Sequence, residues 1–291
     1  MLNRRDVWLG LFLLASLAGI VVIALMVLAL LSVDGISISP KSVAIIEITG
    51  PIIGSSSVVD KLDRYMKNDN VPAVVIRLNT PGGGVVASQE IYETVLKVRQ
   101  TGKKVIASMD AVAASGGYYI AVACDSVVAN PGTITGSIGV IINLADFSEL
   151  YQKIGIDFSA RKSGKFKDMG SSARKMTDEE KALLDSVVMD TYEQFVQAVS
   201  IGRNMDPDQV RPYADGRIFT GRQAKELGFV DELGTYQDAI DLAGIISGLG
   251  KNPPILKEKR DFFEDFVLGG ISKIQRFVME QSIPRLLYIM Q

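Results

Sequence analysis

A single serine, Ser115, lies in the stretch "DAVAASGGYYIA" among residues small enough to leave room for a substrate chain. The segment after it reads as the first turns of a helix. A hydroxyl at that position would lie at the positive end of the helix, where the amide of Gly116 could help to hold an oxyanion. A serine at the start of a helix can equally be an ordinary N-cap. The local sequence therefore allows both a nucleophile and a structural cap.

The proton of such a nucleophile needs an acceptor, and the 291-residue chain contains no histidine. A lysine can act as the base where burial keeps it neutral, whereas carboxylates are weak bases unless strongly perturbed. Lys103 and Lys104 begin the predicted strand that leads toward Ser115, so they would lie about 15 Å or more away, at the opposite edge of a sheet. Three lysines remain in a loop that we expect at the same edge as the serine: Lys162, Lys165 and Lys167. A loop lysine is more often simply solvated, so position alone does not choose among them.

Two other segments have residues suited to the same chemistry. Gly82–Gly84 in "TPGGG" could donate amides to an oxyanion, or could serve only a tight strand-to-helix turn. This stretch fits neither the Walker phosphate loop nor the dinucleotide fingerprint. In "PGTITGSIG", a hydroxyl of Thr133, Thr135 or Ser137 could hold a neutral lysine in place, or could make only local turn bonds.

Strands and helices alternate along the chain after the first 40 residues, which predicts an α/β domain with a mainly parallel sheet. The predicted strands are 42–50, 73–79, 104–109, 126–130 and 139–143, with another inside 154–160, and the predicted helices are 58–68, 85–100, 177–203, 207–214 and 221–227. Thr177 with Glu180, and Thr220 with Gly228, are helix start and stop signals. Ligands of parallel α/β domains gather at the carboxyl ends of the strands. We therefore expect the glycine loop, the Ser115 segment and the three lysines to meet at one edge of the sheet.

Composition excludes several other kinds of site. The formal net charge is −2, and no basic patch points to a nucleic-acid partner. The only cysteine, Cys124, lies in an apolar run and is typical of a buried core residue. A Cys/His nucleophile and a His/Cys zinc cluster are excluded because there is no histidine. We expect neither a metal nor a cofactor.

The N-terminus differs from the rest of the chain. No charged residue occurs from Val7 to Val33, which is longer than the core of a signal peptide and longer than the roughly 20 residues that a helix needs to span a bilayer. We expect residues 1–34 to be a retained membrane anchor rather than a cleaved signal. Two arginines before the run, and only Asp34 just after it, favour a single-pass protein of the cell membrane with a cytoplasmic N-terminus and an extracytoplasmic catalytic domain.

Residues 35–250 would then form the catalytic domain, and residues 251–291 a C-terminal tail. Apolar residues recur with helical spacing from Phe262 to Val278, which predicts an amphipathic helix. Such a helix could dock on its own domain or on a neighbouring subunit, or could lie on a membrane surface.

Five stretches in this order resemble the signal peptide peptidase A family, whose members are membrane-anchored serine–lysine proteases with a ClpP/crotonase-like fold. The stretches are "LNTPGGGV", "AVAASGGYYIA", "TGSIGVI", "SGKFKDMGSSARKMTDEE" and "GRIFTGRQAKELGFVDELG". Each is modest alone, but the five together are specific, and the resemblance covers roughly residues 43–245. One departure is Ser172, where relatives often carry proline, and we expect no effect on the chemistry.

The resemblance implies a role for each matching position. Ser115 would be the nucleophile, Lys167 the general base and Ser137 the residue that orients this lysine. Amides of Gly82–Gly83 and Gly116 would form the oxyanion hole. The chain is similar to the short form of the family, a domain that assembles into a homo-oligomeric ring in which adjacent subunits contribute the serine and the lysine.

The resemblance implies a serine endopeptidase that degrades cleaved signal peptides, or other short unfolded membrane-associated peptides, through an acyl-enzyme. A protease that cuts one specific partner protein is a close variant of this interpretation. One alternative is a crotonase-like enzyme acting on acyl-CoA, since the fold and the oxyanion hole would permit it. Another is a non-catalytic membrane scaffold. The long anchor and the Ser115/Lys167 pair argue against the first alternative, and the pair argues against the second.

Overall fold

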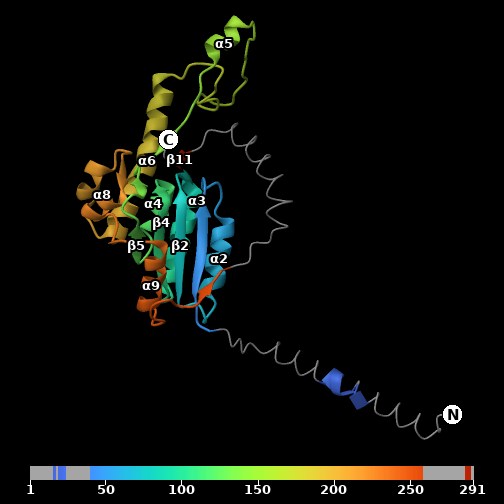
Figure 1. The fold of residues 1–291 in the computed structure, drawn as a ribbon. Helices are drawn as coiled ribbons and strands as arrows, with labels where there is room; N and C mark the ends of the chain where they lie inside the picture. The colour runs from blue at the N-terminus through green and yellow to red at the C-terminus, as the bar shows by residue number, and fades with distance from the viewer. Residues whose placement is uncertain (1–15, 18, 24–39, 258–285, 290–291) are drawn as a thin grey trace, which may run out of the picture. The chain divides into compact units, whose positions relative to one another are not determined.

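The computed structural model describes residues 16–17, 19–23, 40–257 and 286–289 (Figure 1). The chain divides into two compact units, Met1–Pro40 and Lys41–Gln291. In the first unit, residues 16–17 and 19–23 are helical. No helix in the described part of the chain is long and apolar enough to cross a membrane, and most of the predicted anchor lies outside that part.

A large sheet organises the second unit. Its strands lie in the order β10-β1-β2-β4-β5-β9, and β6 pairs with β4 and with β8. The strand bounds are β1 Val43–Thr49, β2 Ala73–Thr80, β4 Lys104–Ala114, β5 Ser126–Ala129, β6 Ile134–Gly136, β8 Ile218–Thr220, β9 Glu232–Leu233 and β10 Ile255–Leu256. Every pair described in this sheet is parallel except β6 with β8, so the predicted mainly parallel α/β architecture is confirmed.

The helices agree with most of the predicted ranges. They are α2 Ser56–Met66, α3 Val85–Gln100, α4 Gly116–Ala121, α5 Ser148–Lys153, α6 Asp178–Arg203, α7 Pro207–Val210, the 3-10 turn η1 Arg211–Tyr213, α8 Gly221–Glu226 and α9 Tyr236–Ile246. Thr177 and Glu180 form the predicted capping box of α6, and Thr220 caps α8. Gly228 follows α8 with a φ of +78°, as a closing glycine should.

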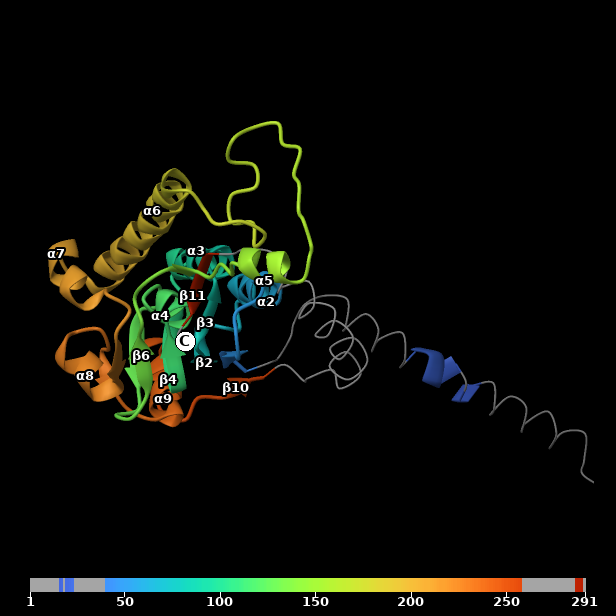
Figure 2. The same ribbon diagram turned by 90° about the horizontal axis from the view of Figure 1, so that it is seen from above.

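The sheet is buried on both faces. α2 and α3 lie on one side of the sheet and α9 on the other (Figure 2). Ala44 and Ile46 of β1 enter the core that includes residues of α2 and α3, whereas Val43 and Ile45 enter a second core that includes residues of α9. Burial of alternate residues on opposite faces explains why the strands read as continuous apolar runs. Cys124 lies in the larger core, so its predicted buried position is confirmed, and burial raises the pKa of its thiol.

The predicted strand inside residues 154–160 is wrong. These residues follow α5 without regular structure, and with the lysine loop, defined here as residues 161–176, they project beyond the carboxyl ends of the strands (Figure 1). The alternation of Ile154, Ile156 and Phe158 resembles a half-buried strand, but all three are exposed, Phe158 at 62%. Alternation makes a strand only where a neighbouring strand offers free backbone groups, and none pairs with this segment in the described part of the chain.

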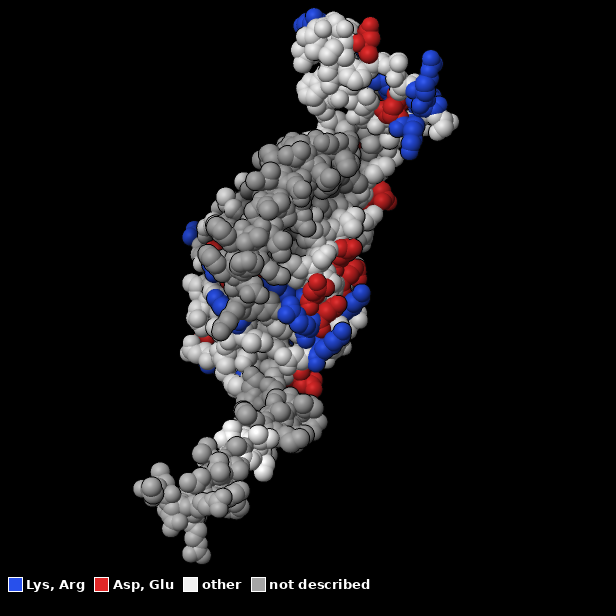
Figure 3. All heavy atoms as spheres, turned by 90° about the vertical axis from the view of Figure 1, so that its right-hand side faces the viewer, with Lys and Arg blue, Asp and Glu red and all other residues white. Residues whose placement is uncertain are grey.

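A small second sheet lies over the glycine loop. β3, Gly82–Gly84, and β7, Ile141–Ile142, both pair antiparallel with β11, Leu286–Ile289. Of the predicted strand 139–143, only β7 forms, and it joins this sheet rather than the main one. The predicted helix from Phe262 to Val278 lies outside the described residues. On the face seen in Figure 3, acidic and basic side chains are interspersed over the described part, in keeping with the nearly balanced charge.

Candidate active site

Ser115 lies in a strained turn between β4 and α4. Its backbone has a φ of 51° and a ψ of −115°, a region that residues other than glycine rarely adopt. Such a conformation costs on the order of 1–3 kcal/mol and persists only where the surroundings enforce it. Here the Ser115 amide donates to the carbonyl of Gly136, and the Ser115 carbonyl accepts from the amide of Tyr119, each over 2.8 Å. A strained strand-to-helix turn is also how the α/β-hydrolases expose a nucleophilic serine.

The hydroxyl of Ser115 is buried and has no hydrogen-bond partner among the described residues. The residue is only 1% exposed, and its side chain makes no capping hydrogen bond to α4. Ser115 therefore stands at the N-cap position of α4, as the sequence allowed, but its side chain does not cap the helix. An unpaired buried hydroxyl costs about 1–3 kcal/mol, so this side chain is held at a cost to stability that no structural role explains.

Ser137 lies beside Ser115 because their strands pair in register. β4 and β6 are parallel with Ala114 opposite Gly136, so the next residue of each strand leaves the sheet at the same edge. Ser137 also has a φ of 51°, and its amide donates to the carbonyl of Arg217 over 2.8 Å. Two serines in strained conformations therefore stand next to each other at the carboxyl ends of neighbouring strands.

The three hydroxyls of "PGTITGSIG" have different partners. Thr133 Oγ1 donates to the carbonyl of Asp110, and Thr135 Oγ1 donates to the carbonyl of Ala113, each over 2.7 Å. Both threonines thereby fasten the β6 segment to β4. Within the described residues the hydroxyl of Ser137 makes no hydrogen bond. Of the three candidates, Ser137 alone has its hydroxyl available for another group.

A cavity of about 930 Å³ opens at Ser137, between β6, β7, α6 and the turn before β8. Its lining is mostly apolar and consists of Ile134, Ser137, Gly139, Val140, Ile141, Val188, Met189, Tyr192, Ala214, Asp215, Gly216, Arg217 and Ile218. A hollow of this size and character accepts a few apolar side chains.

The glycine loop is shaped by close backbone contacts. The Gly82 amide donates to Thr80 Oγ1 over 3.1 Å, and the Gly84 amide donates to the carbonyl of Ile52 over 2.8 Å. A Cβ on Gly83 would lie 2.1 Å from the Ile52 carbonyl oxygen, so only glycine fits there. Of the two oxyanion donors predicted in this loop, Gly82 thus already has an acceptor.

Gly117 brings the Ser115 turn against the strand that leads into the glycine loop. A Cβ on Gly117 would lie 2.6 Å from Thr80 Cγ2. The helix α4 also contacts β3. The absence of a side chain at Gly117 therefore lets the Ser115 turn and the glycine loop approach each other closely.

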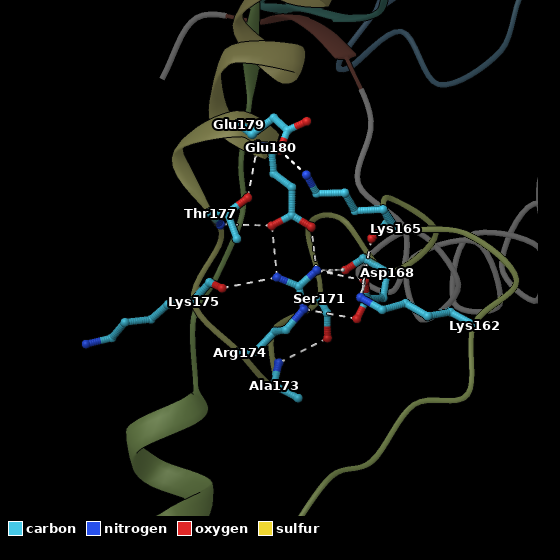
Figure 4. A network of polar contacts seen from close by, with 10 residues as sticks. All are labelled: Lys162, Lys165, Asp168, Ser171, Ala173, Arg174, Lys175, Thr177, Glu179 and Glu180. Carbon is cyan, nitrogen blue, oxygen red and sulfur yellow. Dashed lines mark hydrogen bonds and ion pairs between the residues drawn. The ribbon is translucent and has the colours of Figure 1, made fainter.

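Ion pairs distinguish the three candidate lysines, Lys162, Lys165 and Lys167, of the lysine loop. The Lys162 ammonium contacts Asp168 over 2.5 Å, and the Lys165 ammonium contacts Glu179 (Figure 4). The Lys167 side chain is exposed, and its ammonium makes no hydrogen bond or ion pair within the described residues. Only Lys167 of the three therefore has a free amine.

Within one chain, no hydrogen bond between the described residues connects Lys167 to Ser115. The predicted strand inside 154–160 that would bring the lysines to the sheet edge is absent, and the lysine loop projects away from the sheet (Figures 1 and 2). Lys103 is excluded as predicted, because its ammonium donates to the carbonyls of Asn68 and Val71 over 2.6 and 2.7 Å.

Arg174 was not among the predicted site residues, yet its guanidinium binds both Asp168 and Glu180 and fastens the lysine loop to α6 (Figure 4). The only signal in the sequence was the capping box of Thr177 and Glu180, which gives no indication of an arginine partner. No group of three His, Cys, Asp or Glu side chains is arranged to hold a metal in the part of the chain that the structure describes.

Comparison with known proteins gives a consistent result. The model of peptidase family S49 matches residues 97–248. A Synechocystis protein provisionally named as a protease is 43% identical over 242 residues, which are 81% of this chain and 86% of that protein. An Enterococcus faecium protein provisionally named signal peptide peptidase SppA is 40% identical over 181 residues, 62% of this chain and 53% of that protein. The chloroplastic serine protease SPPA of Arabidopsis thaliana is 33% identical over 217 residues, 72% of this chain and 32% of that protein.

Proposed function

The chain belongs to peptidase family S49 and is a serine peptidase, and we propose that Ser115 is its nucleophile and Lys167 its general base. The observation that carries this proposal is a pattern of unpaired polar groups. The hydroxyls of Ser115 and Ser137 and the ammonium of Lys167 have no partners on the described residues. The neighbouring threonines and lysines are all engaged in hydrogen bonds or ion pairs.

In this mechanism the oxygen of Ser115 attacks the carbonyl carbon of the scissile peptide, and its proton passes to neutral Lys167. The amides of Gly116 and Gly83 stabilise the oxyanion that forms. Lys167 then gives the proton to the departing amine, which leaves an acyl-enzyme on Ser115. Lys167 next takes a proton from a water molecule as that water attacks the ester carbonyl, and it returns the proton to the Ser115 oxygen as the ester C–O bond breaks. This step releases the acid product and restores the free serine and the neutral lysine. The hydroxyl of Ser137 holds the lysine amine in position throughout.

An extended peptide is the substrate that suits this site. β11 is itself an extended segment that pairs antiparallel with β3, with Tyr288 opposite Gly83. A substrate chain in the same position would gain main-chain hydrogen bonds beside Ser115, which is the β-augmentation mode of peptide recognition. We propose that the substrates are cleaved signal peptides or other short unfolded peptides, and the name of the Enterococcus relative agrees with this substrate class.

A second copy of the chain would bring its Lys167 to the Ser115 of the first copy, a contact that one copy does not make by itself. Large apolar side chains are exposed on the segment before the lysine loop: Phe147, Leu150, Ile154, Ile156 and Phe158. Exposed apolar patches of this kind mark interfaces. If they pack against the cavity at Ser137 of a neighbour, the contact would also bury Lys167, and desolvation favours its neutral form. A head-to-tail contact closes into a ring where the rotation between copies allows it, and we propose such a ring, with the dyad shared across each contact.

Membrane attachment through residues 1–34 is also part of the proposal, with the N-terminus in the cytoplasm and the catalytic domain outside it. The support is the uncharged run from Val7 to Val33. An anchor there would hold the active site near peptides released from the membrane.

The deciding experiment is labelling with a serine-reactive phosphonate followed by mass-spectrometric mapping of the modified residue. We expect modification at Ser115 and none in Ser115→Ala. Lys167→Ala should abolish peptide cleavage in a folded protein, whereas the matched variant Lys165→Ala should keep it, because the Lys165 ammonium is already in an ion pair. Full turnover in Lys167→Ala would remove the base assignment. A folded protein that cleaves no peptide, and that the phosphonate does not label, would favour the acyl-CoA enzyme or the scaffold.

A further inference from the structure

Arg174 holds two carboxylates at once. Its Nε and Nη2 donate to the two carboxylate oxygens of Asp168 over 3.0 and 2.7 Å, and its Nη1 donates to Glu180 over 2.9 Å (Figure 4). Nη1 also donates to the carbonyl of Lys175 over 3.1 Å. A planar guanidinium can bridge two carboxylates in this way, which an ammonium on a flexible stem cannot.

The two carboxylates belong to different parts of the fold. Asp168 is in the lysine loop and directly follows Lys167. Glu180 is in the first turn of α6, with its side chain 3% exposed, and it accepts from the amide of Thr177 over 2.9 Å. Arg174 thus connects a rigid helix end to the residue next to Lys167, in a segment that otherwise has no regular structure.

Arg174 also balances the negative charge of Asp168. Asp168 directly follows Lys167 in the chain. An unpaired carboxylate that comes near a lysine favours the protonated form of that lysine, which is the wrong form for a base. Hydrogen bonds from Arg174 and then from Lys162 lower the pKa of Asp168, so its negative charge is matched by two cations.

We propose that Arg174 is a positioning residue for Lys167, which it serves by fixing the lysine loop on α6 and by neutralising the carboxylate of Asp168. The inference rests on the proposed function, since it takes Lys167 as the base. Besides Lys167, the lysine loop, the first turn of α6 and α5 carry these charged side chains: Arg161, Lys162, Lys165, Asp168, Arg174, Lys175, Asp178, Glu179, Glu180, Lys181, Glu149 and Lys153. Of these, Arg174 alone binds carboxylates of both the loop and α6.

The test is the pH profile of kcat/KM for a fluorogenic peptide, because its acid limb reports the ionisation of the essential base in the free enzyme. In Arg174→Gln we expect kcat/KM to fall by about 10- to 100-fold, since a displaced catalytic group costs that much. We also expect the acid limb to move to higher pH by about half a unit to one unit, because the carboxylate of Asp168 is then less fully paired. In the double variant Arg174→Gln/Asp168→Asn the acid limb should return to its wild-type pH, because the carboxylate is gone, while kcat/KM stays low.

Arg203 provides the control at the other end of the same helix. Its guanidinium donates two hydrogen bonds of 2.8 and 2.6 Å to Asp231, and its side chain is 8% exposed. Arg203 is therefore a comparable arginine–carboxylate pair that lies away from the lysine loop. Arg203→Gln should lower Tm without moving the acid limb. An acid limb that stays in place in Arg174→Gln, or that remains shifted in the double variant, would overturn the proposal.

A variant that keeps the charge covers the case in which Arg174→Gln does not fold. Arg174→Lys retains a cation but cannot bridge the two carboxylates, so kcat/KM should fall while the acid limb stays near its original pH. Wild-type kcat/KM in Arg174→Lys would overturn the positioning role. Activity that survives in Lys167→Ala would instead overturn the proposed function, so the two failures are distinguishable.

Discussion

The amide of Ser115 donates a 2.8 Å hydrogen bond to the carbonyl of Gly136. This bond joins the ends of β4 and β6 and sets Ser115 and Ser137 side by side, each with a φ of 51°. Neither hydroxyl is used by the surrounding structure, although both residues are buried. The fold therefore maintains two strained, unpaired serines at one sheet edge, and strain of this kind is typical of functional sites.

Replacing Ser115 by glycine should separate stability from activity. Glycine adopts the observed backbone conformation without strain and leaves no buried hydroxyl unpaired. The free energy of unfolding of Ser115→Gly should therefore exceed that of wild type by about 1 kcal/mol. Peptide cleavage should be lost. Chemical denaturation and a peptide assay measure the two effects. As a control, Asn204→Gly at the left-handed C-cap of α6 should keep full activity, and a less stable Ser115→Gly would contradict the strain argument.

Mixing two inactive variants tests whether the dyad is shared between subunits. Ser115→Ala and Lys167→Ala should each be inactive alone. When they are mixed and allowed to reassemble, some interfaces would combine an intact Ser115 with an intact Lys167, and activity should reappear in proportion to those interfaces. Native mass spectrometry checks that mixed oligomers form. Mixed oligomers that stay inactive would favour a dyad within one chain.

The glycine loop allows a test with neighbouring positions. Gly83→Ala should destabilise the loop and strongly reduce activity, because the new methyl group would lie 2.1 Å from the Ile52 carbonyl oxygen. Gly84→Ala should be tolerated, since the nearest atom would be 3.6 Å away. Thermal unfolding and kcat/KM of both variants make the comparison. Equal behaviour of the two would show that the close contact at Gly83 is not what shapes the loop.

The C-terminal strand should compete with substrate. β11 pairs with β3, where we expect the substrate to bind. A chain that ends at residue 285 should therefore show a lower KM for short peptides, with kcat nearly unchanged. A synthetic peptide of residues 286–291 should inhibit the shortened chain, and the same peptide with proline at position 288 should inhibit it less, because proline removes a donor from the ladder. An unchanged KM after truncation would show that substrate does not use this position.

The stability that Glu180 contributes should depend on pH in a defined window. Hydrogen bonds from Arg174 and from the amide of Thr177 lower the pKa of Glu180 to about 2, from an ordinary value of 4.5. A depressed folded-state pKa gives stability that is present above the unfolded value and is lost as pH falls. The Tm difference between wild type and Glu180→Gln should therefore be full above about pH 4.5 and shrink toward pH 2. Glu149→Gln, in an exposed ion pair, should change Tm little at any pH.

Elements with a strong local pattern could be predicted from the sequence. α3 has the predicted bounds, α6 begins after the predicted cap, and the buried strands appear where continuous apolar runs stand. The strand inside 154–160 could not be judged in this way, because alternation is local whereas a strand needs a partner elsewhere. The pairing of β11 with β3 also escaped, since it joins segments about 200 residues apart.

The sequence by itself determined the α/β class, the lack of any histidine base and the short set of candidate serines, glycines and lysines. Only the tertiary structure decided which of these candidates have free polar atoms. Caps and periodicities depend on residues a few positions apart, so they can be read along the chain. Whether a hydroxyl or an ammonium finds a partner depends on which distant groups the packed strands and loops bring within about 3 Å. For that reason Thr133, Thr135, Lys162 and Lys165 were separable from Ser137 and Lys167 only in three dimensions.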